Sequence, residues 1–265
     1  KPLTVTITVA VFPIVEIKDY KGVEVEQLEV EVKPEAVENE IKSMQKRNAR
    51  VVVAEREVKE GDTVVLDYAG FVGEDGESHQ GVFDTSFLNS VVGLTVFAPS
   101  TFDELEAMFY QAIYKIDGAV AVRYPRGCQC DIPVEYEYNH ENYTVIGDTN
   151  KKKCIVSYGR EFCECAKALN ELDDTFLIKL NKIKPIDESV VEYLRNCETV
   201  YFYEESVKSG SVGEIFASLL IENDINVHFK HIAIDDEFVK QASVCRQLEH
   251  YNLDMNSIIK EVNNG

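Results

Sequence analysis

Hydrophobic and polar residues alternate with a period of two along much of residues 1–70. The stretches "LTVTITV" at residues 3–9 and "KGVEVEQLEVEV" at residues 21–32 place apolar side chains on one face and polar side chains on the other, which is typical of half-buried β-strands. A helix is predicted to begin at Pro34, because the missing N–H costs nothing in a first helical turn. We therefore expect a β-rich segment with one helix at this end of the chain.

Beyond residue 70 the pattern changes to apolar strands and amphipathic helices. "GLTVFAPS" and "AVAVRYP" are predicted strands, and the helix between them carries an apolar face from Leu105 to Ile116. Ser100 and Asp103 are spaced as a capping-box-like pair at the start of this helix. The stretch from Cys128 to Lys153 has weak periodicity and is predicted to be a linker.

From Cys154 onward, strand patterns and helix patterns alternate. The predicted strands are "CIVSYG", "TFLIKL", "TVYFYEE" and "NVHFKHIAI", and a helical pattern follows each of them. This alternation favours right-handed crossovers and a mainly parallel open sheet. The sequence therefore predicts an α/β fold, in which Asp187 and Glu188 cap one of the crossover helices.

The chain is strongly acidic, with a formal net charge of −20 over 265 residues. A field of this sign repels phosphate backbones and anionic lipid. No apolar run reaches the roughly 20 residues that a membrane helix needs. Nucleic acid and membrane surfaces are therefore excluded as general partners, whereas a local basic pocket for a small phosphate is still compatible with the charge.

Seven cysteines and the lack of a signal sequence favour free thiols in a reducing cytoplasm. Two Cys-x-Cys pairs, Cys128/Cys130 and Cys163/Cys165, offer a metal or redox site as the alternative. Zinc sites usually use the spacing Cys-x-x-Cys, which lets two thiolates reach one tetrahedral ion. Buried or incidental cysteines are therefore the preferred interpretation.

Three stretches carry a more specific signature: "AGFVGEDGESHQGVFDTSFL", "APSTFDELEAMFYQA" and "DGAVAVRYPRG". They resemble the 1-deoxy-D-xylulose-5-phosphate synthases of the transketolase-like family, and the resemblance continues through "YGR", "KPID", "YEESVKSGSVGEIFASLL" and "DDEFV", over about residues 69–265. It implies a transferase that joins pyruvate and glyceraldehyde 3-phosphate, with loss of carbon dioxide, in isoprenoid precursor, thiamine and pyridoxal phosphate synthesis. It also implies a homodimer that uses thiamine diphosphate and Mg²⁺.

The same resemblance implies roles for four residues. Asp75 and His79 are expected to be catalytic and to contact the hydroxyl and carbonyl groups of the substrate. Arg123 and Arg126 are expected to bind the substrate phosphate, because a guanidinium fork fits phosphate oxygens. Tyr68 departs from the family, which usually has Arg immediately before Ala-Gly. The family's Gly-Asp-Gly motif for the metal and the diphosphate is absent from this sequence, so no cofactor-binding or metal-binding residue is predicted and this chain is expected to be inactive by itself.

Each candidate also has an ordinary interpretation without the resemblance. Asp75 is then a turn residue and His79 a loop histidine, and the two arginines are surface ion-pair partners. The stretch "SGSVG" at residues 209–213 precedes a predicted helix. It is either a phosphate site at a helix N-terminus or a plain turn into that helix.

Residues 1 to about 73 resemble a different family, trigger factor, a ribosome-associated chaperone with an FKBP-like prolyl isomerase domain. The string "AGFVG" fits both families, so the chain reads as a chimera of three parts. These are a trigger-factor-like segment at 1–70, part of a pyrimidine-binding domain at 71–140, and a transketolase C-terminal domain at 141–265. A natural fusion, a truncated gene and an assembly artefact remain open. The alternative functions are a chaperone or isomerase fragment and a non-catalytic dimerisation module.

Overall fold

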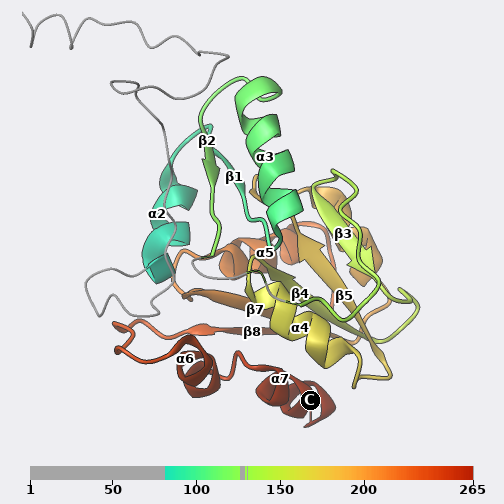
Figure 1. Ribbon diagram of the computed structural model, residues 1–265. Helices are drawn as coiled ribbons and strands as arrows, with labels where there is room; N and C mark the ends of the chain where they lie inside the picture. The colour runs from blue at the N-terminus through green and yellow to red at the C-terminus, as the bar shows by residue number, and fades with distance from the viewer. Residues whose placement is uncertain (1–80, 126–128, 130, 265) are drawn as a thin grey trace, which may run out of the picture. The chain divides into compact units, whose positions relative to one another are not determined.

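The computed structural model describes residues 81–125, 129 and 131–264 (Figure 1). The chain divides into two compact units, Lys1–Val64 and Val65–Gly265, and all described residues belong to the second. The expected N-terminal strands and helix therefore lie outside the described residues.

A five-stranded sheet forms the centre of the described unit (Figure 1). In spatial order its strands are β3 (Tyr143–Ile146), β5 (Thr175–Leu180), β4 (Lys153–Tyr158), β7 (Thr199–Val207) and β8 (His228–Ile234). β3 pairs antiparallel with β5, and the other three pairings are parallel. The predicted α/β fold with a mainly parallel sheet is confirmed.

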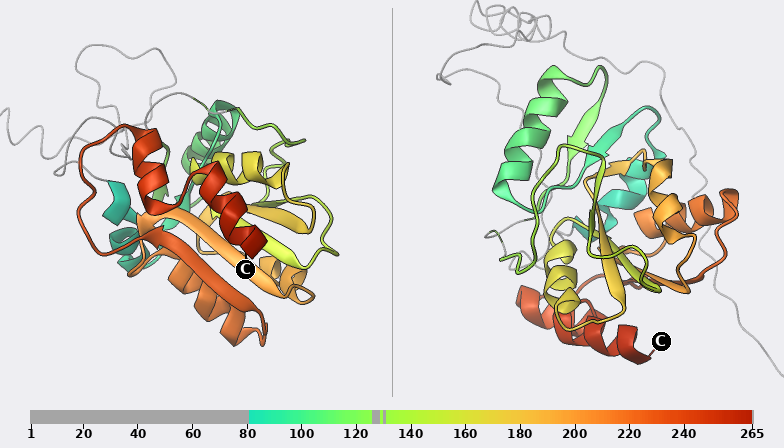
Figure 2. Two further views of the ribbon diagram at one scale, coloured as in Figure 1. Left: turned by 90° about the horizontal axis from the view of Figure 1, so that it is seen from below. Right: turned by 90° about the vertical axis from the view of Figure 1, so that its right-hand side faces the viewer.

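Helices cover both faces of this sheet (Figure 2). On one face lie α4 (Glu161–Leu169), α6 (Val244–Tyr251) and α7 (Met255–Asn264). On the other lie α5 (Val212–Glu222) and the 3₁₀ helix η2 (Glu188–Leu194). All nine residues of β7 are buried as a result, as expected for a central strand of a sheet covered on both faces.

A smaller three-stranded sheet has the order β2 (Val120–Val122), β1 (Thr95–Phe97), β6 (Lys182–Lys184). β1 pairs parallel with β2 and antiparallel with β6. The helix α3 (Phe102–Tyr114) packs its buried Met108 against Phe97 and Val122. Only one residue separates β6 from β5, so the chain passes directly from the larger sheet to the smaller one.

Three local predictions need correction. The stretch expected to be a linker contains β3, a short edge strand that pairs with a partner more than thirty residues away. The helix predicted at 187–197 is the 3₁₀ helix η2, although Asp187 does cap it by accepting from the N–H of Ser189. The cap of α3 is Thr101, whose side chain accepts from the N–H of Glu104, because the Ser100 hydroxyl donates to the carbonyl of Gly159 instead.

Candidate active-site scaffold

The ends of β2 and β7 converge on the start of α2 (Asp84–Ser90), which follows the short 3₁₀ helix η1 (Gly81–Phe83). In open α/β sheets, ligands usually bind beyond the carboxyl ends of the parallel strands. Gly81 is also the last residue of "EDGESHQG", the sequence motif that contains His79. We therefore treat this region as the scaffold of the candidate site.

Arg123, just after β2, is the central side chain of this scaffold, and its side chain is only 10% exposed. Its Nε donates to both carboxylate oxygens of Asp84, at 2.9 and 2.8 Å. Its Nη2 donates to the carbonyls of Glu205 at 3.0 Å and Gly81 at 3.4 Å. Burial lowers the pKa of Arg123, but the charge of Asp84 together with Tyr158 and Glu205 outweighs burial and raises it. The guanidinium is therefore a fixed charge that holds η1 and α2 against β7.

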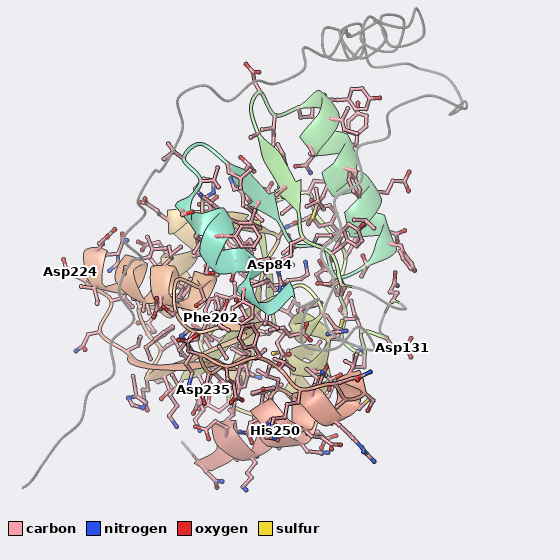
Figure 3. All side chains as sticks on the ribbon, turned by 90° about the vertical axis from the view of Figure 1, so that its left-hand side faces the viewer. Asp84, Asp131, Phe202, Asp224, Asp235 and His250 are labelled. Carbon is pink, nitrogen blue, oxygen red and sulfur yellow. The ribbon has the colours of Figure 1, made fainter. Side chains whose placement is uncertain are left out.

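Two hydroxyl groups add to this attachment. Thr85 Oγ1 and Ser206 Oγ are hydrogen-bonded to each other, and Ser206 Oγ also donates to the carbonyl of Val82 at 3.0 Å. Figure 3 shows Asp84 at the end of α2 nearest the five-stranded sheet. Residues 82–85 are thus attached to β7 by the Arg123 guanidinium and by the hydroxyl groups of Thr85 and Ser206.

Glu205 connects this scaffold to the other face of the sheet. Its carboxylate accepts from Arg160 in a two-bond arrangement, Nε to Oε1 at 2.8 Å and Nη2 to Oε2 at 3.0 Å. Such planar pairs are among the strongest hydrogen-bonded contacts in proteins. Because the backbone carbonyl of Glu205 accepts from Arg123, this residue connects two arginines.

The neighbouring Glu204 is fully buried and accepts three hydrogen bonds. The donors are Tyr158 Oη at 2.6 Å, the N–H of Gly213 at 3.0 Å and His231 Nε2 at 2.6 Å, with the histidine written as the donor. Burial, and then the charge of Glu204, raise the pKa of Tyr158 well above its usual value. The Glu204 carboxylate therefore occupies the N-terminus of α5, where a phosphate would otherwise bind. The structure favours the plain-turn interpretation of "SGSVG".

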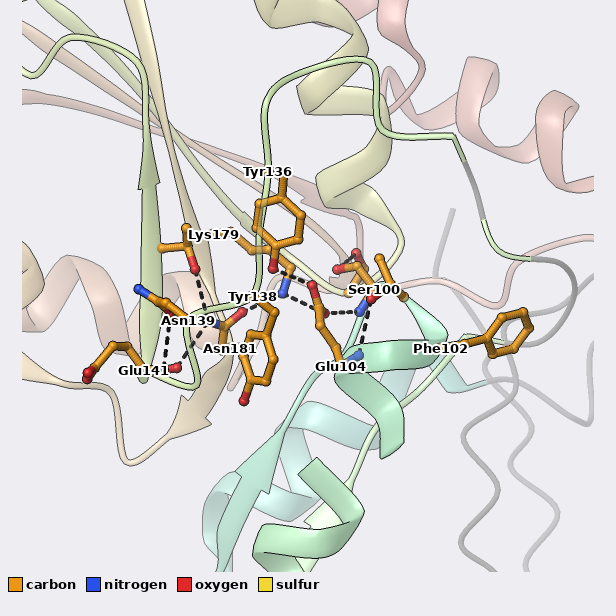
Figure 4. Close-up of polar contacts among 12 residues, drawn as sticks. Ser100, Phe102, Glu104, Tyr136, Tyr138, Asn139, Glu141, Lys179 and Asn181 are labelled. Atoms are coloured by element: carbon orange, nitrogen blue, oxygen red, sulfur yellow. Dashed lines mark hydrogen bonds and ion pairs between the residues drawn. The ribbon is translucent and has the colours of Figure 1, made fainter. Parts of the chain in front are cut away.

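A second buried charge pair joins α3 to the larger sheet (Figure 4). Lys179 of β5 and Glu104 of α3 are both fully buried, and their Nζ and Oε2 atoms are 2.9 Å apart. Lys179 also donates to Asn181 Oδ1 at 2.5 Å, while Glu104 accepts from the N–H of Ser100 at 2.6 Å and from the hydroxyl of Tyr136. Burial lowers the pKa of Lys179, and the Glu104 carboxylate opposes this effect.

The cysteines correct one expectation. Cys163 is disulfide-bonded, so the expectation of free thiols is wrong for this residue. Cys154, Cys165 and Cys197 are buried free thiols and Cys245 is an exposed one. Burial raises the pKa of Cys154 and Cys165 well above the usual value and that of Cys197 to about 11.

Neither a metal centre nor a membrane span is found in the part of the chain that the structure describes. Within it, no group of three or more His, Cys, Asp or Glu side chains is arranged to hold a metal ion. Each helix within the same ranges is too short or too polar for a bilayer crossing.

Of the four predicted site residues, the structure places one. Asp75, His79 and Arg126 lie outside the described residues. Arg123 lies at the centre of the scaffold, where its Nε and Nη2 make internal contacts. Its role in phosphate binding stays a prediction.

Sequence reasoning missed five charged residues that form the buried contacts of this region: Asp84, Glu204, Glu205, Glu104 and Lys179. A signal for three of them was present, because "TVYFYEE" and "TFLIKL" carry charged residues within otherwise apolar strands. A charge in a strand that must be buried on both faces requires a partner. The sequence pattern alone does not name that partner.

Comparison with known proteins identifies the domains. Residues 48–129 match the family model "Transketolase, pyrimidine binding domain", residues 142–258 match "Transketolase, C-terminal domain", and residues 1–44 match "Bacterial trigger factor protein (TF)". Both predicted resemblances are confirmed. The domain boundaries expected near residues 70 and 140 stay a prediction.

Two curated relatives are named 1-deoxy-D-xylulose-5-phosphate synthase. The one from Marinomonas sp. (strain MWYL1) is 34% identical over 203 residues, which are 74% of this chain and 32% of the relative. The one from Shouchella clausii (strain KSM-K16) is 33% identical over 200 residues, 72% of this chain and 31% of the relative. The chain therefore spans about a third of the length of these relatives.

Solved structures show the same fold. A chain described as "Split gene transketolase, inactive beta4 tetramer" aligns with a TM-score of 0.61 and 21% identity, over 74% of this chain and 65% of that one. A transketolase from Campylobacter jejuni subsp. jejuni NCTC 11168 aligns with a TM-score of 0.57 and 15% identity, over 73% of this chain and 29% of that one. With the domain models and the curated relatives, these alignments show that the chain, from residue 48 to residue 258, belongs to the transketolase-like family.

Proposed function

We propose that the transketolase-like part of this chain is the substrate side of a 1-deoxy-D-xylulose-5-phosphate synthase. One observation carries the proposal. Arg123, from the "RYPRG" motif, is hydrogen-bonded to Gly81, the last residue of the "EDGESHQG" motif, and to Asp84, three residues further along the chain. The hydrogen bonds of Arg123 thus hold together, at the ends of β2 and β7, two motifs that are about forty residues apart in the sequence. Residues of both motifs must lie close together if they form one substrate site.

The roles follow from the chemistry of each side chain. Asp75 and His79 are proposed to contact the hydroxyl and carbonyl groups of the substrate, since an imidazole and a carboxylate can hold or move a proton there. Arg126 and Arg123 are proposed to bind the phosphate of glyceraldehyde 3-phosphate. Because Arg123 makes four internal contacts, we assign the larger share of phosphate binding to Arg126.

Thiamine diphosphate and Mg²⁺ supply the carbanion chemistry in this family. The described residues do not fit the diphosphate and its metal. The N-terminus of α5 is occupied by the Glu204 carboxylate, whose charge repels a diphosphate. We therefore derive no step through the cofactor from these residues.

A second polypeptide or a further domain is proposed to supply the cofactor side. The solved chain described as "Split gene transketolase, inactive beta4 tetramer" supports an arrangement in which a chain of this extent is a separate subunit without activity of its own. A homodimer in the cytoplasm, as the family implies, belongs to the same proposal.

The proposal is tested by measuring product formation from pyruvate and glyceraldehyde 3-phosphate with thiamine diphosphate and Mg²⁺. We expect no product from the chain alone. We expect product when the cofactor-binding part of a 1-deoxy-D-xylulose-5-phosphate synthase is added as a separate polypeptide. Substituting His79→Ala should abolish this product, whereas Glu171→Gln, an exposed position after α4, should leave it unchanged.

Calorimetric titration separates the cofactor side from the substrate side. Glyceraldehyde 3-phosphate is expected to bind weakly to the chain alone, and Arg126→Ala should remove this binding. Micromolar, saturable binding of thiamine diphosphate with Mg²⁺ to the chain alone would contradict the assignment of the cofactor to a second part. Absence of both substrate binding and product in the mixed assay would contradict the proposed function itself.

A second candidate function rests on the trigger factor match at residues 1–44. We propose that this segment binds unfolded polypeptide but lacks prolyl isomerase activity, because the match ends before the isomerase pocket of that family. An Xaa-Pro test peptide should isomerise at the same rate with and without the chain. A rate increase that disappears when residues 1–70 are deleted would overturn this proposal.

A further inference from the structure

Glu161 is a carboxylic acid buried without a partner at the first position of α4. Its residue is 1% exposed, and within the described part of the chain neither carboxylate oxygen has a hydrogen-bond partner. An ionised carboxylate in such a place is strongly unfavourable, because burial removes its hydration and nothing replaces it.

The groups around Glu161 make its ionisation still harder. Three carboxylates face it: Glu205 from β7, Glu164 from α4 and Asp254 from the loop before α7. The charge of Arg160 opposes this effect, and its guanidinium is engaged with Glu205.

The neutral neighbours of Glu161 offer it no compensation. These are Cys165 and Tyr203, and burial raises the pKa of both. Burial first, and then the charges of the facing carboxylates, raise the pKa of Glu161 well above its usual value.

Two of the facing carboxylates also hold the N-terminus of α7. Glu164 Oε2 accepts from the N–H of Met255 at 3.1 Å. Asp254 Oδ2 accepts from the N–H groups of Asn256 at 3.1 Å and Ser257 at 3.3 Å. Because these carboxylates satisfy the free N–H groups of the helix, a negative charge on Glu161 acts directly on the attachment of α7.

The rest of α7 is attached by apolar burial and by two polar contacts. Ile258 and Val262 are buried against the sheet, Lys153 Nζ donates to the carbonyl of Val262 at 2.5 Å, and Lys230 pairs with Glu261 at 2.7 Å. The turn before the helix contains Asn252 in the left-handed region, at φ 59°. The helix thus ends the described chain, and a single short turn connects it to α6.

We propose that Glu161 acts as a proton-dependent latch for the C-terminal helix α7. While the carboxyl group keeps its proton, α4 and the start of α7 pack together around a neutral side chain. When the carboxyl group ionises, repulsion from Glu164 and Asp254 loosens the N-terminus of α7. The proton is exchanged with solvent, and no other group is changed in the step.

The sign of the pH dependence follows from linkage. The folded chain holds the Glu161 proton to a higher pH than the unfolded chain, because the pKa is raised in the folded state. The stabilisation is therefore complete below the ordinary pKa of a glutamic acid, and it is lost as pH rises toward the folded-state pKa. Because one proton is involved, the equilibrium constant for opening of α7 rises by up to roughly tenfold per pH unit.

Amide hydrogen exchange of residues 255–264, corrected for intrinsic rates, measures the latch between pH 5 and pH 9. In the unaltered chain we expect protection to fall with pH by up to roughly tenfold per unit. In Glu161→Gln, which copies the protonated form, protection should be independent of pH and equal to the value of the unaltered chain at pH 5. Asp254→Asn keeps a side chain that can cap the helix. It removes one of the charges that raise the pKa of Glu161, so the total loss of protection between pH 5 and pH 9 should be smaller than in the unaltered chain.

The matched control is Glu171→Gln, an exposed glutamate that follows α4, which should show the pH dependence of the unaltered chain. A pH-independent protection of residues 255–264 in the unaltered chain would overturn the proposal. Loss of protection at every pH in Glu161→Gln would also overturn it, since it would mean that the carboxylate is ionised and paired. Near-ultraviolet circular dichroism of each variant shows whether the fold is kept.

Discussion

The two sheets of the described unit are held together in different ways. The five-stranded sheet has helices and large buried clusters on both faces. The three-stranded sheet has one small cluster beneath α3, built on Phe97, Met108 and Val122. Its helix exposes large apolar side chains, namely Phe102, Tyr110, Ile113 and Tyr114. The larger sheet thus owes its stability to apolar burial, whereas the smaller part depends more on its attachments.

Those attachments are largely buried charges. Lys179 with Glu104 joins α3 to the larger sheet, and Arg123 with Asp84 and Glu205 joins β2 and α2 to β7. Apolar contacts of Leu94, Val96 and Ala98 with the larger cluster add to them. We therefore expect hydrogen exchange to be faster in residues 81–125 than in residues 153–234.

The largest effect is expected for Lys179→Met. This substitution leaves the fully buried Glu104 without its opposite charge, which costs about 3–5 kcal/mol of unfolding free energy. Chemical denaturation measures the loss, and hydrogen exchange should locate it first in α3. The double variant Lys179→Met with Glu104→Leu should recover most of the stability, because a buried pair replaced by apolar groups is often neutral. Equal losses in the single and double variants would show that the charge pair is not the attachment.

The next effect is expected for Arg123→Met. Removing the guanidinium leaves Asp84, whose side chain is 12% exposed, without its charge partner, and should cost about 3 kcal/mol. Hydrogen exchange should increase in residues 81–90 more than in α4. Arg123→Lys should recover little, since one ammonium group does not reproduce the contacts of a planar guanidinium. Unchanged exchange in residues 81–90 would remove Arg123 from the attachment.

Much of the larger sheet was predictable from the sequence, and most of the attachments were not. Apolar strands alternating with amphipathic helices predicted the parallel pairing of β4, β5, β7 and β8. β3 escaped prediction because a four-residue edge strand in a polar stretch has too few positions to show a period. Thr101 escaped prediction as the α3 cap because the competing Ser100 hydroxyl is bonded to Gly159, 59 residues away.

The same limit applies to the candidate site. The "RYPRG" motif pointed to Arg123, whereas Lys179, Glu204 and Glu205 were missed, although they are charged residues within apolar strands. Their partners are set by tertiary packing, since Asp84 lies 39 residues before Arg123 and Glu104 lies 75 residues before Lys179. Sequence patterns describe periodicity within one element, so they cannot select a contact between two elements.

A smaller effect within the larger sheet is expected for Gly213→Ala. A Cβ atom at this position would lie 2.8 Å from Glu204 Oε1 and 2.6 Å from His231 Cδ2, both closer than side chains tolerate. We expect a loss of about 1–3 kcal/mol from overpacking, measured by chemical denaturation. Adding His231→Ala should relieve part of this loss, because the second change removes the ring that the new methyl group meets. Additive losses in the double variant would show that the ring is not the obstacle.

The smallest effect is expected for an exposed ion pair, which tests whether burial or short distance makes the buried pairs strong. Arg195 and Glu192 are joined by two hydrogen bonds of 2.7 Å each, which is shorter than the 2.9 Å between Lys179 and Glu104. Their side chains, however, are 47% and 58% exposed. Water and salt screen an exposed pair, so Arg195→Ala should not change the denaturation midpoint measurably. If Arg195→Ala instead destabilised the chain as much as Lys179→Met, the short distance alone would set the strength of an ion pair, and burial would not explain how the smaller sheet is attached.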